Sequence, residues 1–576
     1  MSAPSATSEA MALAAPARAV LDTALQPLKR GSVDWVSLPI AERIVLLERL
    51  ARDVAAVAER WAGAGILAKG LDPAGPAASE EWIAGPYLVL RNLRLLGRTL
   101  RDIQAHGQPR IPGPIATRDG GQVVARVFPL DLYDRLFYRG VTAEVWLEPE
   151  VRAAELGESL APAYRSPAPA VRIALVLGGG NVSSIGPMDA LYKLFVDNQA
   201  VLLKLHPVNA YLRPILEQGF RALIERGALR LAKGGPAEGA YLCHHPLVDE
   251  IHITGSDRTV EAIVFGAGPE GERRKAERRP LLAKRISCEL GNVSPVLVVP
   301  GRWSASALDY QAANLVSMLA NNAGFNCNAL RVLILHAEWP QREALLDRIR
   351  RLLARLPPRK AYYPGAADRH RAFVAAHPDA ERFGSAGAGQ LPWTLISGLA
   401  PDAAEEIAYR TEAFCSLFCE TKISAPTPAA FLERAVAFAN DRLWGTLNAT
   451  ILAAPGSGRD REIGAAIERA IGALRYGTVS INHWAAVGFG LVVTPWGAFP
   501  GHDLYDIQSG VGVVHNTLMF SRVQKTVLRA PFRVWPTPVW FVTHRRARAL
   551  AGKLIGFEAA PSAWKAAGIV WSALRG

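Results

Sequence analysis

Short apolar runs alternate with amphipathic segments from residue 171 to residue 253, and this alternation constrains the fold more than any other feature of the sequence. The runs expected to be strands span residues 171–177, 200–203, 228–232 and 250–253, and the segments expected to be helices span residues 187–197 and 214–226. Buried strands that alternate with helices are typical of a parallel sheet covered by helices on both faces. A second stretch of this kind runs from about Leu290 to about residue 485, so the sequence predicts two doubly wound α/β units.

The size and composition of the chain indicate a globular protein with more than one domain. Its 576 residues are half hydrophobic and one fifth charged, which excludes a disordered chain. No apolar run reaches the length of about 18 residues that a membrane span needs. The first 19 residues lack a basic region and a continuous apolar region, so we expect no secretory signal, and we expect residues 1–34 to be a flexible segment.

Positive charge is concentrated in two segments. The formal net charge is +13, and residues 272–285 carry seven basic and two acidic side chains. Residues 521–576 carry ten basic and one acidic side chain, so the rest of the chain is close to neutral. This distribution argues against a nucleic-acid partner, which would favour a broader basic surface. We expect residues 272–285 to be a solvated surface loop, with an anion or partner site as the alternative.

The C-terminal basic segment also contains four tryptophans, Trp535, Trp540, Trp564 and Trp571. Basic side chains meet anionic headgroups and indoles sit at the boundary of a bilayer, so this composition suits a membrane surface. The alternative is that the tryptophans pack on the body of the protein or on a neighbouring subunit. Both interpretations stay open at this point.

The chain has five cysteines, Cys243, Cys288, Cys327, Cys415 and Cys419. None of them forms a pair with zinc-site spacing, so we expect no metal site. So sparse and odd a set indicates free thiols in a reducing, cytoplasmic setting. One of these thiols is a candidate nucleophile.

A glycine-rich loop follows the first predicted strand of the sheet. Gly178 and Gly180 fit the start of a dinucleotide-binding fingerprint, but Ser183 stands where its third glycine belongs. The next strand ends in Lys204, and a lysine cannot accept hydrogen bonds from ribose hydroxyls as an acid would. The usual fingerprint therefore fails, and both features need another explanation.

From about residue 35 to residue 520 the sequence resembles the aldehyde dehydrogenase superfamily. The motifs that carry the resemblance occur in the family's order and are Gly180-Asn181, Lys204-Leu-His-Pro207, Ile253-Thr-Gly-Ser256, Glu289-Leu-Gly-Asn-Val-Ser-Pro295, Asn322-Ala-Gly-Phe-Asn-Cys327, Glu412-Ala-Phe414, residues 440–447, Gly477-Thr-Val-Ser-Ile-Asn482 and Pro495-Trp-Gly497. Each motif is weak alone, but their order and spacing make the resemblance specific. It implies a cofactor domain that is a Rossmann variant without the glycine fingerprint.

The resemblance also implies a domain plan. We expect a cofactor domain over residues 35–288, with arm strands near residues 141–160, and a catalytic thiol domain over residues 289–490. Residues 491–520 are expected to form an oligomerisation or closing segment, and residues 521–576 a basic aromatic extension. The family implies a homo-oligomer, either a dimer or a tetramer, in which residues 141–160 or 495–520 cross to a neighbouring subunit.

Three residues are expected to carry the chemistry. Oxidation of an aldehyde by hydride loss needs a tetrahedral adduct, and the thiolate of Cys327 is the candidate to form it. The Asn181 amide and the Cys327 backbone N–H would stabilise the oxyanion of that adduct. Glu289 would activate the water that hydrolyses the resulting thioester. The alternatives are a buried apolar thiol, a loop asparagine and a plain surface glutamate.

By resemblance, the cofactor is NAD or NADP. Lys204 would bind the adenosine ribose, Gly255 and Ser256 would lie beside the diphosphate, and Leu290 belongs to the same site. Glu412 would hold the nicotinamide ribose.

Four departures from the family pattern affect these details. Gly180 replaces a larger residue and would enlarge the wall of the site, and Pro207 stands where an acid often selects NAD, so NADP stays open. The turn after Thr254 lacks a second glycine, and Cys415-Ser416 replaces Gly-Pro. The insertion at residues 266–283 has no counterpart.

Three functions remain after this reading. The first is NAD(P)-dependent oxidation of an apolar aldehyde to a carboxylate, with the aldehyde delivered from a membrane surface. The second is a CoA-dependent acyl-CoA reductase that uses the same cysteine, because Gly180 and the basic residues 272–285 suit a phosphate-bearing acceptor. The third is a catalytically silent binding protein. The intact set of Asn181, Glu289 and Cys327 favours the first.

Overall fold

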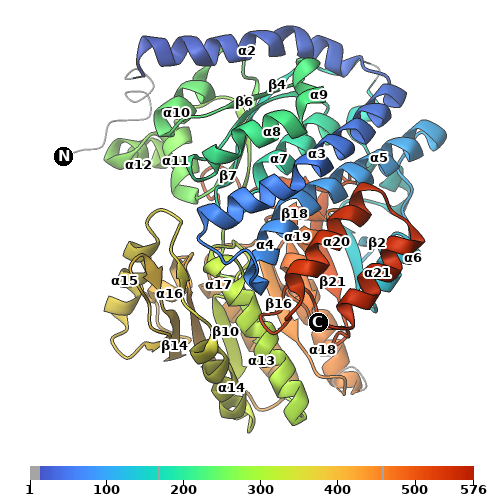
Figure 1. The fold of residues 1–576 in the computed structure, drawn as a ribbon. Helices are drawn as coiled ribbons and strands as arrows, with labels where there is room; N and C mark the ends of the chain where they lie inside the picture. Colours follow the sequence, from blue (N-terminus) through green and yellow to red (C-terminus); the bar gives the residue numbers. More distant parts are fainter. Residues whose placement is uncertain (1–12, 167, 457–459) are drawn as a thin grey trace.

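The computed structural model describes residues 13–166, 168–456 and 460–576, and two sheets organise it (Figure 1). The first sheet has six strands in the order β19 (Gly510–Val511), β8 (Arg285–Leu290), β7 (Glu250–Gly255), β4 (Ile173–Leu177), β5 (Ala200–Lys204) and β6 (Leu229–Ala232). All neighbours pair in parallel except β19, which runs antiparallel to β8. The predicted alternation therefore forms a parallel sheet.

Helices cover both faces of this six-stranded sheet. One face carries α2 (Ala15–Val36), α10 (Pro236–His244) and α11 (Asp257–Phe265), with α12 (Gly268–Ala276) packed on α11. The other face carries α3 (Ile40–Ala68), α7 (Ile185–Leu191), α8 (Arg213–Gly219) and α9 (Arg221–Glu225). Successive residues of β4 point to opposite faces, so Leu175 joins the core under α2 and Val176 joins the core under α3. The sheet is doubly wound, as predicted.

The N-terminal segment differs from the expectation. Residues 1–12 lie outside the described residues, but α2 is an ordered helix rather than a flexible segment. Its residues Leu21, Leu25 and Leu28 are buried against the sheet, because they recur at helical spacing and present one apolar stripe. The sequence did not indicate this helix, because the small and polar residues that precede it resemble a flexible segment.

The second sheet has eleven strands. Their order is β1 (Ile115–Thr117), β2 (Val123–Phe128), β3 (Thr142–Leu147), β21 (Val523–Arg529), β17 (Thr478–Ile481), β16 (Asn448–Leu452), β9 (Pro295–Val298), β10 (Val332–His336), β15 (Leu417–Ile423), β14 (Trp393–Leu399) and β12 (Glu381–Phe383). The seven strands from β21 to β14 are parallel neighbours. The helices α13 (Ala305–Ala320) and α14 (Arg342–Arg355) cover one face, and α17 (Pro428–Arg442) and α18 (Arg461–Ala473) cover the other. The prediction of two doubly wound parallel-sheet units is confirmed.

Several further elements are short. They include α15 (Ala366–Ala376), α16 (Ile407–Arg410), α19 (Ala486–Leu491) and two strand pairs, β11 (Arg359–Lys360) with β13 (Gln390–Leu391) and β18 (Pro495–Gly497) with β20 (Val513–His515).

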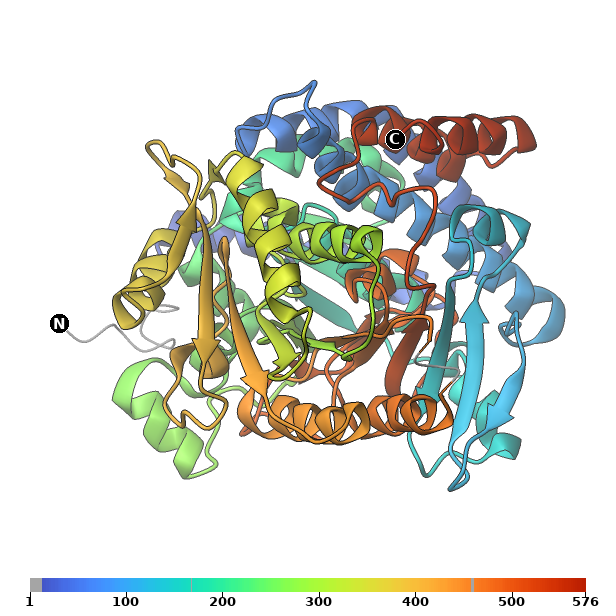
Figure 2. The same cartoon turned by 90° about the horizontal axis from the view of Figure 1, so that it is seen from below.

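The predicted β arm is an extension of the eleven-stranded sheet. Strands β1, β2 and β3 form an antiparallel group, and β3 pairs antiparallel with β21 of the same chain, with Val145 opposite Thr526. Figure 2 shows these blue and cyan strands at one side of the molecule and the yellow strands of the other sheet edge at the opposite side. Residues 142–147 therefore pair within the chain that contains them.

A helical layer formed by both ends of the chain lies over the sheets (Figure 1). It contains α3, α4 (Ser79–Trp82), α5 (Leu88–His106) and the C-terminal helices α20 (Ala547–Ala559) and α21 (Ala563–Ala573). The buried guanidinium of Arg91 on α5 ties these parts together, because it binds Glu558 of α20 at 3.0 Å and Asp134 of α6 (Leu132–Phe137) at 3.1 Å.

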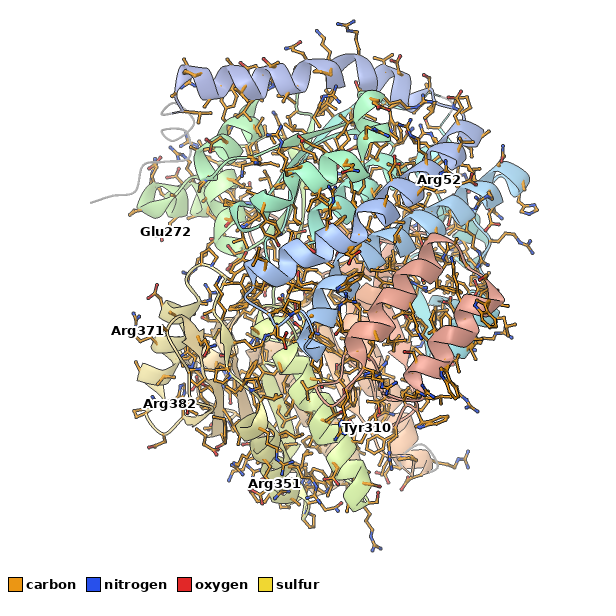
Figure 3. All side chains as sticks on the ribbon, viewed as in Figure 1. Arg52, Glu272, Tyr310, Arg351, Arg371 and Arg382 are labelled. Atoms are coloured by element: carbon orange, nitrogen blue, oxygen red, sulfur yellow. The ribbon has the colours of Figure 1, made fainter. Side chains whose placement is uncertain are left out.

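The segment between β21 and α20 runs along α13. The backbone N–H of Val534 donates to the Tyr310 hydroxyl at 3.0 Å, and Phe541 packs on the Tyr310 ring, which Figure 3 labels. Trp540 packs on Trp484 with ring centroids 5.3 Å apart, so this tryptophan lies on the body of the protein. Among the described helices, none is long and apolar enough to cross a bilayer.

Candidate active site

The site lies at the carboxyl ends of the strands of the six-stranded sheet. Leu177 of β4 is in register with Lys204 of β5 on one side and with Ile253 of β7 on the other. The glycine loop, Lys204 and the turn at Gly255 therefore leave the sheet at one edge. Ligands of open α/β sheets bind at such an edge.

Cys327 follows a strained turn at the end of α13. Asn322, Ala323 and Gly324 have consecutive positive φ angles of 52°, 55° and 81°. A Cβ atom on Gly324 would lie 2.3 Å from the carbonyl oxygen of Cys415, so only glycine fits this close approach. The guanidinium of Arg331 fixes the same contact, because it donates to the carbonyl oxygens of both residues.

The backbone and the thiol of Cys327 have different surroundings. Its carbonyl oxygen accepts hydrogen bonds from Ser294 Oγ at 3.2 Å and Asn448 Nδ2 at 3.4 Å. Its side chain packs against an apolar group made of Tyr192, Leu447, Phe489, Trp496 and Val514. Polar side chains thus fix the backbone of the predicted nucleophile, while its thiol faces aromatic side chains.

Glu289 ends β8 beside this thiol. The Glu289 side chain is buried, hydrogen-bonds Cys327, and accepts a hydrogen bond from Trp496 Nε1 at 3.2 Å. Burial raises the pKa of Glu289 to about 8, and the neighbouring Asp189 carboxylate adds to the rise. Burial also raises the pKa of the Cys327 thiol, and Glu289 raises it further. The resting pair therefore keeps its protons near neutral pH.

Asn181 contacts the nucleophile loop directly. Its side-chain Nδ2 donates to the carbonyl oxygen of Phe325 at 2.9 Å. Its own carbonyl oxygen accepts from Lys69 Nζ at 3.1 Å and from Asn322 Nδ2 at 2.9 Å, and lies 2.9 Å from the Tyr362 hydroxyl. The three predicted residues Cys327, Glu289 and Asn181 therefore meet in one site.

Sequence reasoning missed the group behind Asn181. Lys69, directly after α3, donates to Glu81 Oε1 of α4 at 2.6 Å and to Asn322 Oδ1 at 2.9 Å. Burial opposes the charge of Lys69, but Glu81 outweighs it and raises the pKa of Lys69. The neighbouring Glu80 accepts from the Asn322 backbone N–H at 3.0 Å. No motif marks Lys69 or Glu81, and the adjacent acids on a short helix were the single available signal.

Glu412 contacts the loop that follows Glu289. A Cβ atom on Gly291 would lie 1.9 Å from Glu412 Oε2, so the carboxylate rests directly on this glycine. Glu412 Oε1 is buried and has no hydrogen-bond partner among the described residues. Burial raises the pKa of Glu412 to about 8, although Arg331 and Arg369 oppose the rise. An unpartnered buried acceptor of this kind fits a ligand that brings hydroxyl donors.

The predicted adenosine end of the cofactor site has mixed exposure. Lys204 is buried, which lowers its pKa, while Glu238 at the start of α10 opposes the shift. Ser256 is exposed, and its Oγ accepts from the Thr259 backbone N–H at 3.2 Å at the N-terminus of α11. Gly255 is exposed and pairs with Leu290, which is buried. Lys204 and Ser256 thus offer a cation and a helix N-terminus, and both suit an anionic cofactor.

Gly180 does not enlarge the site as expected. A Cβ atom at this position would lie 2.3 Å from Nδ1 of His206, so the imidazole occupies the space that the glycine leaves. The His206 ring stacks on Tyr363 with centroids 5.7 Å apart. Burial lowers the pKa of His206 to about 4, so the ring is neutral.

The basic residues 272–285 also differ from the expected loop. They form the end of α12 and the segment after it. Their cations bind acids of the same surface, such as Arg273 with Glu270 at 2.9 Å and Lys275 with Glu261. The charge of this segment is largely neutralised, which removes the argument for an anion site there.

Comparisons with known proteins agree with this geometry. The sequence model of the aldehyde dehydrogenase family matches residues 199–366, a range that contains Lys204, Glu289 and Cys327. This match supports membership of the aldehyde dehydrogenase superfamily. It is 29% identical over 247 residues to the aminoacetaldehyde dehydrogenase of Pseudomonas aeruginosa, a match that covers 40% of this chain and 45% of that protein.

A second relative is the N-succinylglutamate 5-semialdehyde dehydrogenase of Novosphingobium aromaticivorans, 28% identical over 182 residues, 31% of this chain and 35% of that protein. The matched regions thus span less than half the length of these curated relatives. Among solved structures, the aldehyde dehydrogenase KauB of Pseudomonas aeruginosa matches with a TM-score of 0.59 and 18% identity, covering 89% of each chain.

The NADP-dependent glyceraldehyde-3-phosphate dehydrogenase of Bacillus halodurans, solved with NADP, matches with a TM-score of 0.58 and 17% identity. This match covers 88% of the present chain and 91% of the other. The aldehyde dehydrogenase fold therefore extends over nearly the whole chain, beyond the range in which the sequences align.

Proposed function

We propose that this protein oxidises an apolar aldehyde to a carboxylate with NAD or NADP. The observation that carries the proposal is the hydrogen bond between Cys327 and the buried Glu289, beside Asn181 at the carboxyl edge of the sheet. A thiol nucleophile, a carboxylate base and an amide donor are the groups that acyl transfer through a thioester requires.

The reaction begins when the Cys327 thiol gives its proton to solvent water and becomes a thiolate. The thiolate then attacks the aldehyde carbon, and a carbon–sulfur bond forms while the carbonyl oxygen becomes an oxyanion. Asn181 Nδ2 uses one hydrogen for Phe325, so its second hydrogen is available to this oxyanion beside the Cys327 backbone N–H. Loss of hydride from the adduct leaves a thioester on Cys327.

Glu289 acts in the second half-reaction. In its ionised form it takes a proton from a water molecule, and the hydroxide attacks the thioester carbon. The carbon–sulfur bond breaks, the thiolate of Cys327 is restored, and the carboxylate product leaves. A pKa near 8 suits Glu289 for this proton transfer, because a base works best when its pKa is close to the working pH.

Lys204, Gly255, Ser256, Leu290 and Glu412 are the residues proposed to hold the cofactor. The cofactor supplies the acceptor for the hydride. The unpartnered Glu412 Oε1 suits ribose hydroxyls, and the α11 N-terminus at Ser256 suits a diphosphate.

An apolar substrate follows from the wall around the thiol. Tyr192, Phe489 and Trp496 pack in the same group as Cys327, and aromatic walls exclude water and favour apolar chains. Two features of the sequence favoured the CoA-dependent alternative, the space at Gly180 and the basic residues 272–285. Neither favours it in the structure, because His206 fills the space and acids neutralise the basic residues. Glu289 also favours hydrolysis.

We further propose a cytoplasmic homo-oligomer, a dimer or a tetramer, that takes its aldehyde from a membrane surface through residues 521–576. Five cysteines without a disulfide suit a reducing compartment. Because β3 and β20 already pair within the chain, an assembly would use another edge, such as the exposed strand β1.

A single-turnover experiment tests the chemistry. Wild type is mixed with a medium-chain aldehyde and NAD or NADP, with and without CoA, and compared with Glu289→Gln and with Glu338→Gln, an exposed glutamate. We expect acid and reduced cofactor from wild type and the control, and a thioester on Cys327 by mass spectrometry in Glu289→Gln. Turnover that requires CoA and ignores Glu289 would overturn hydrolysis, and no turnover with any aldehyde would overturn the oxidation.

A further inference from the structure

The outward face of α21 carries large apolar side chains. Trp564, Trp571 and Leu574 are 88%, 57% and 43% exposed, and their spacing places them on one side of the helix. The opposite side packs inward through Ala566 and Ile569. A helix that is already packed on the protein has no structural need for two exposed tryptophans.

The short helix α6 adds to this surface. Tyr133 and Phe137 of α6 pack on Phe557 of α20, in the same apolar cluster as Ala566 and Ile569 of α21. Figure 1 shows α6 and α21 side by side at the same corner of the molecule. Leu132 and Leu136 of α6 are 75% and 47% exposed. The two helices thus present apolar side chains near each other.

Unpaired cations accompany the apolar residues. Arg545, Arg546, Lys553, Lys565 and Arg575 are exposed, and in the described parts of the chain none of them forms an ion pair. Lys553 and Lys565 donate to carbonyl oxygens of the helix pair, and Arg575 lies 4.1 Å from the centre of the Trp571 ring.

The acids of the same region do not offset this charge. Glu558, the single acid after residue 520, is buried and bound to Arg91 and Arg94. Asp134 is buried on Arg91 as well, and Asp131 lies 3.6 Å from Arg98.

We propose that the surface formed by α6 and α21 binds an anionic lipid membrane. Cations attract anionic headgroups, while tryptophan and leucine side chains enter the boundary between headgroups and acyl chains. A second copy of the chain fits less well, because a twofold contact would place the same cations against each other. Membrane binding itself does not depend on the proposed function. Its proposed purpose, delivery of an apolar aldehyde, rests on that function.

Co-sedimentation with vesicles tests the binding without any turnover. The full chain is mixed with vesicles that contain phosphatidylserine or with vesicles of phosphatidylcholine alone. We expect wild type to bind the first in a salt-sensitive way and to bind the second at least about tenfold more weakly. Trp564→Ser/Trp571→Ser should weaken binding about tenfold or more, and Lys565→Gln/Arg575→Gln should weaken it and reduce the salt dependence.

Matched controls lie far from the surface. Val20→Ser/Val33→Ser replaces exposed apolar residues of α2, and Arg351→Gln/Arg382→Gln replaces exposed arginines on the opposite lobe, labelled in Figure 3. These variants should bind as wild type does, and all variants should keep single-turnover activity with a water-soluble aldehyde.

The proposal is wrong if wild type does not bind phosphatidylserine vesicles, if the tryptophan variant binds equally well, or if the variant instead dissociates a dimer. Loss of turnover with intact vesicle binding would overturn the proposed oxidation and leave the docking surface in place.

Discussion

Lys69 Nζ lies 2.6 Å from Glu81 Oε1, and both side chains are buried between the N-terminal helices and the nucleophile loop. The same ammonium donates to the Asn181 carbonyl oxygen and to Asn322 Oδ1, and these two asparagines are also hydrogen-bonded to each other. Because Asn322 begins the turn of positive φ that leads to Cys327, the ion pair holds a strained segment in place.

Replacement of Lys69 by methionine should lower both stability and activity. The change leaves Glu81 buried without a partner, which costs about 3–5 kcal/mol of unfolding free energy. It also removes the donor to Asn181, so kcat should fall more than KM rises. Chemical denaturation and steady-state kinetics measure the two effects.

The double variant Lys69→Met/Glu81→Leu separates positioning from stability. It removes both charges and should recover most of the unfolding free energy. Its kcat should stay low, because Asn181 and Asn322 still lack their donor. Full recovery of kcat in the double variant would show that the pair acts through stability alone.

Hydrolysis of the thioester should follow the ionisation of Glu289. Burial raises the pKa of Glu289 to about 8, so the carboxyl is protonated below this pH and cannot accept a proton from water. The deacylation rate should therefore fall roughly tenfold per pH unit below about 8 and level off above it. Rapid-quench measurement of the acyl-enzyme across this range checks the profile, and a Glu289→Gln rate that keeps the same slope would contradict it.

A methyl group on Gly291 should weaken cofactor binding. The Cβ atom of Gly291→Ala would lie 1.9 Å from Glu412 Oε2 and would displace the carboxylate proposed to hold ribose hydroxyls. We expect the Kd for NAD to rise about tenfold, equivalent to about 1.4 kcal/mol, as in Glu412→Ala. Isothermal titration calorimetry measures this, and Gly63→Ala, where the added methyl group contacts nothing within 4 Å, is the control.

Glu238 should set the preference between NAD and NADP. Its carboxylate lies close enough to Lys204 to oppose the fall in the pKa of that lysine, so a negative charge is present where the adenosine ribose is proposed to bind. A 2′-phosphate would be repelled there. Glu238→Gln keeps an acceptor for the Gly235 backbone N–H and should lower the Kd for NADP about tenfold, with little change for NAD. Glu272→Gln, an exposed change on α12, should alter neither.

The parts that the sequence predicted are those that depend on local pattern or on short motifs. Alternating apolar runs predicted β4 to β7, and the motifs indicated Asn181, Glu289 and Cys327, which the fold brings together. Lys69 escaped because it contacts Asn181 and Asn322, which lie more than one hundred positions away, and Glu81 because it acts through Lys69. The position of His206 was not predicted for a related reason. Its side chain comes from a different motif and fills the space beside Gly180. The pairing of β21 with β17 is also nonlocal, and no pattern in residues 521–576 indicates it.

Trp540 should affect catalysis and leave membrane binding unchanged. Its ring packs on Trp484, and Trp484 Nε1 donates at 2.7 Å to the carbonyl oxygen of Asn328, the residue after Cys327. Trp540→Ala should free the Trp484 indole to move, lower the unfolding free energy by about 1–3 kcal/mol and reduce kcat. Trp535→Ala is the control, because that indole is 66% exposed and lies in the same segment. We expect two roles in the C-terminal segment: the stretch before α20 supports the nucleophile, and α21 binds lipid. Kinetics and vesicle binding, measured on both variants, distinguish these roles. Loss of vesicle binding in Trp540→Ala with unchanged kcat would reverse this assignment.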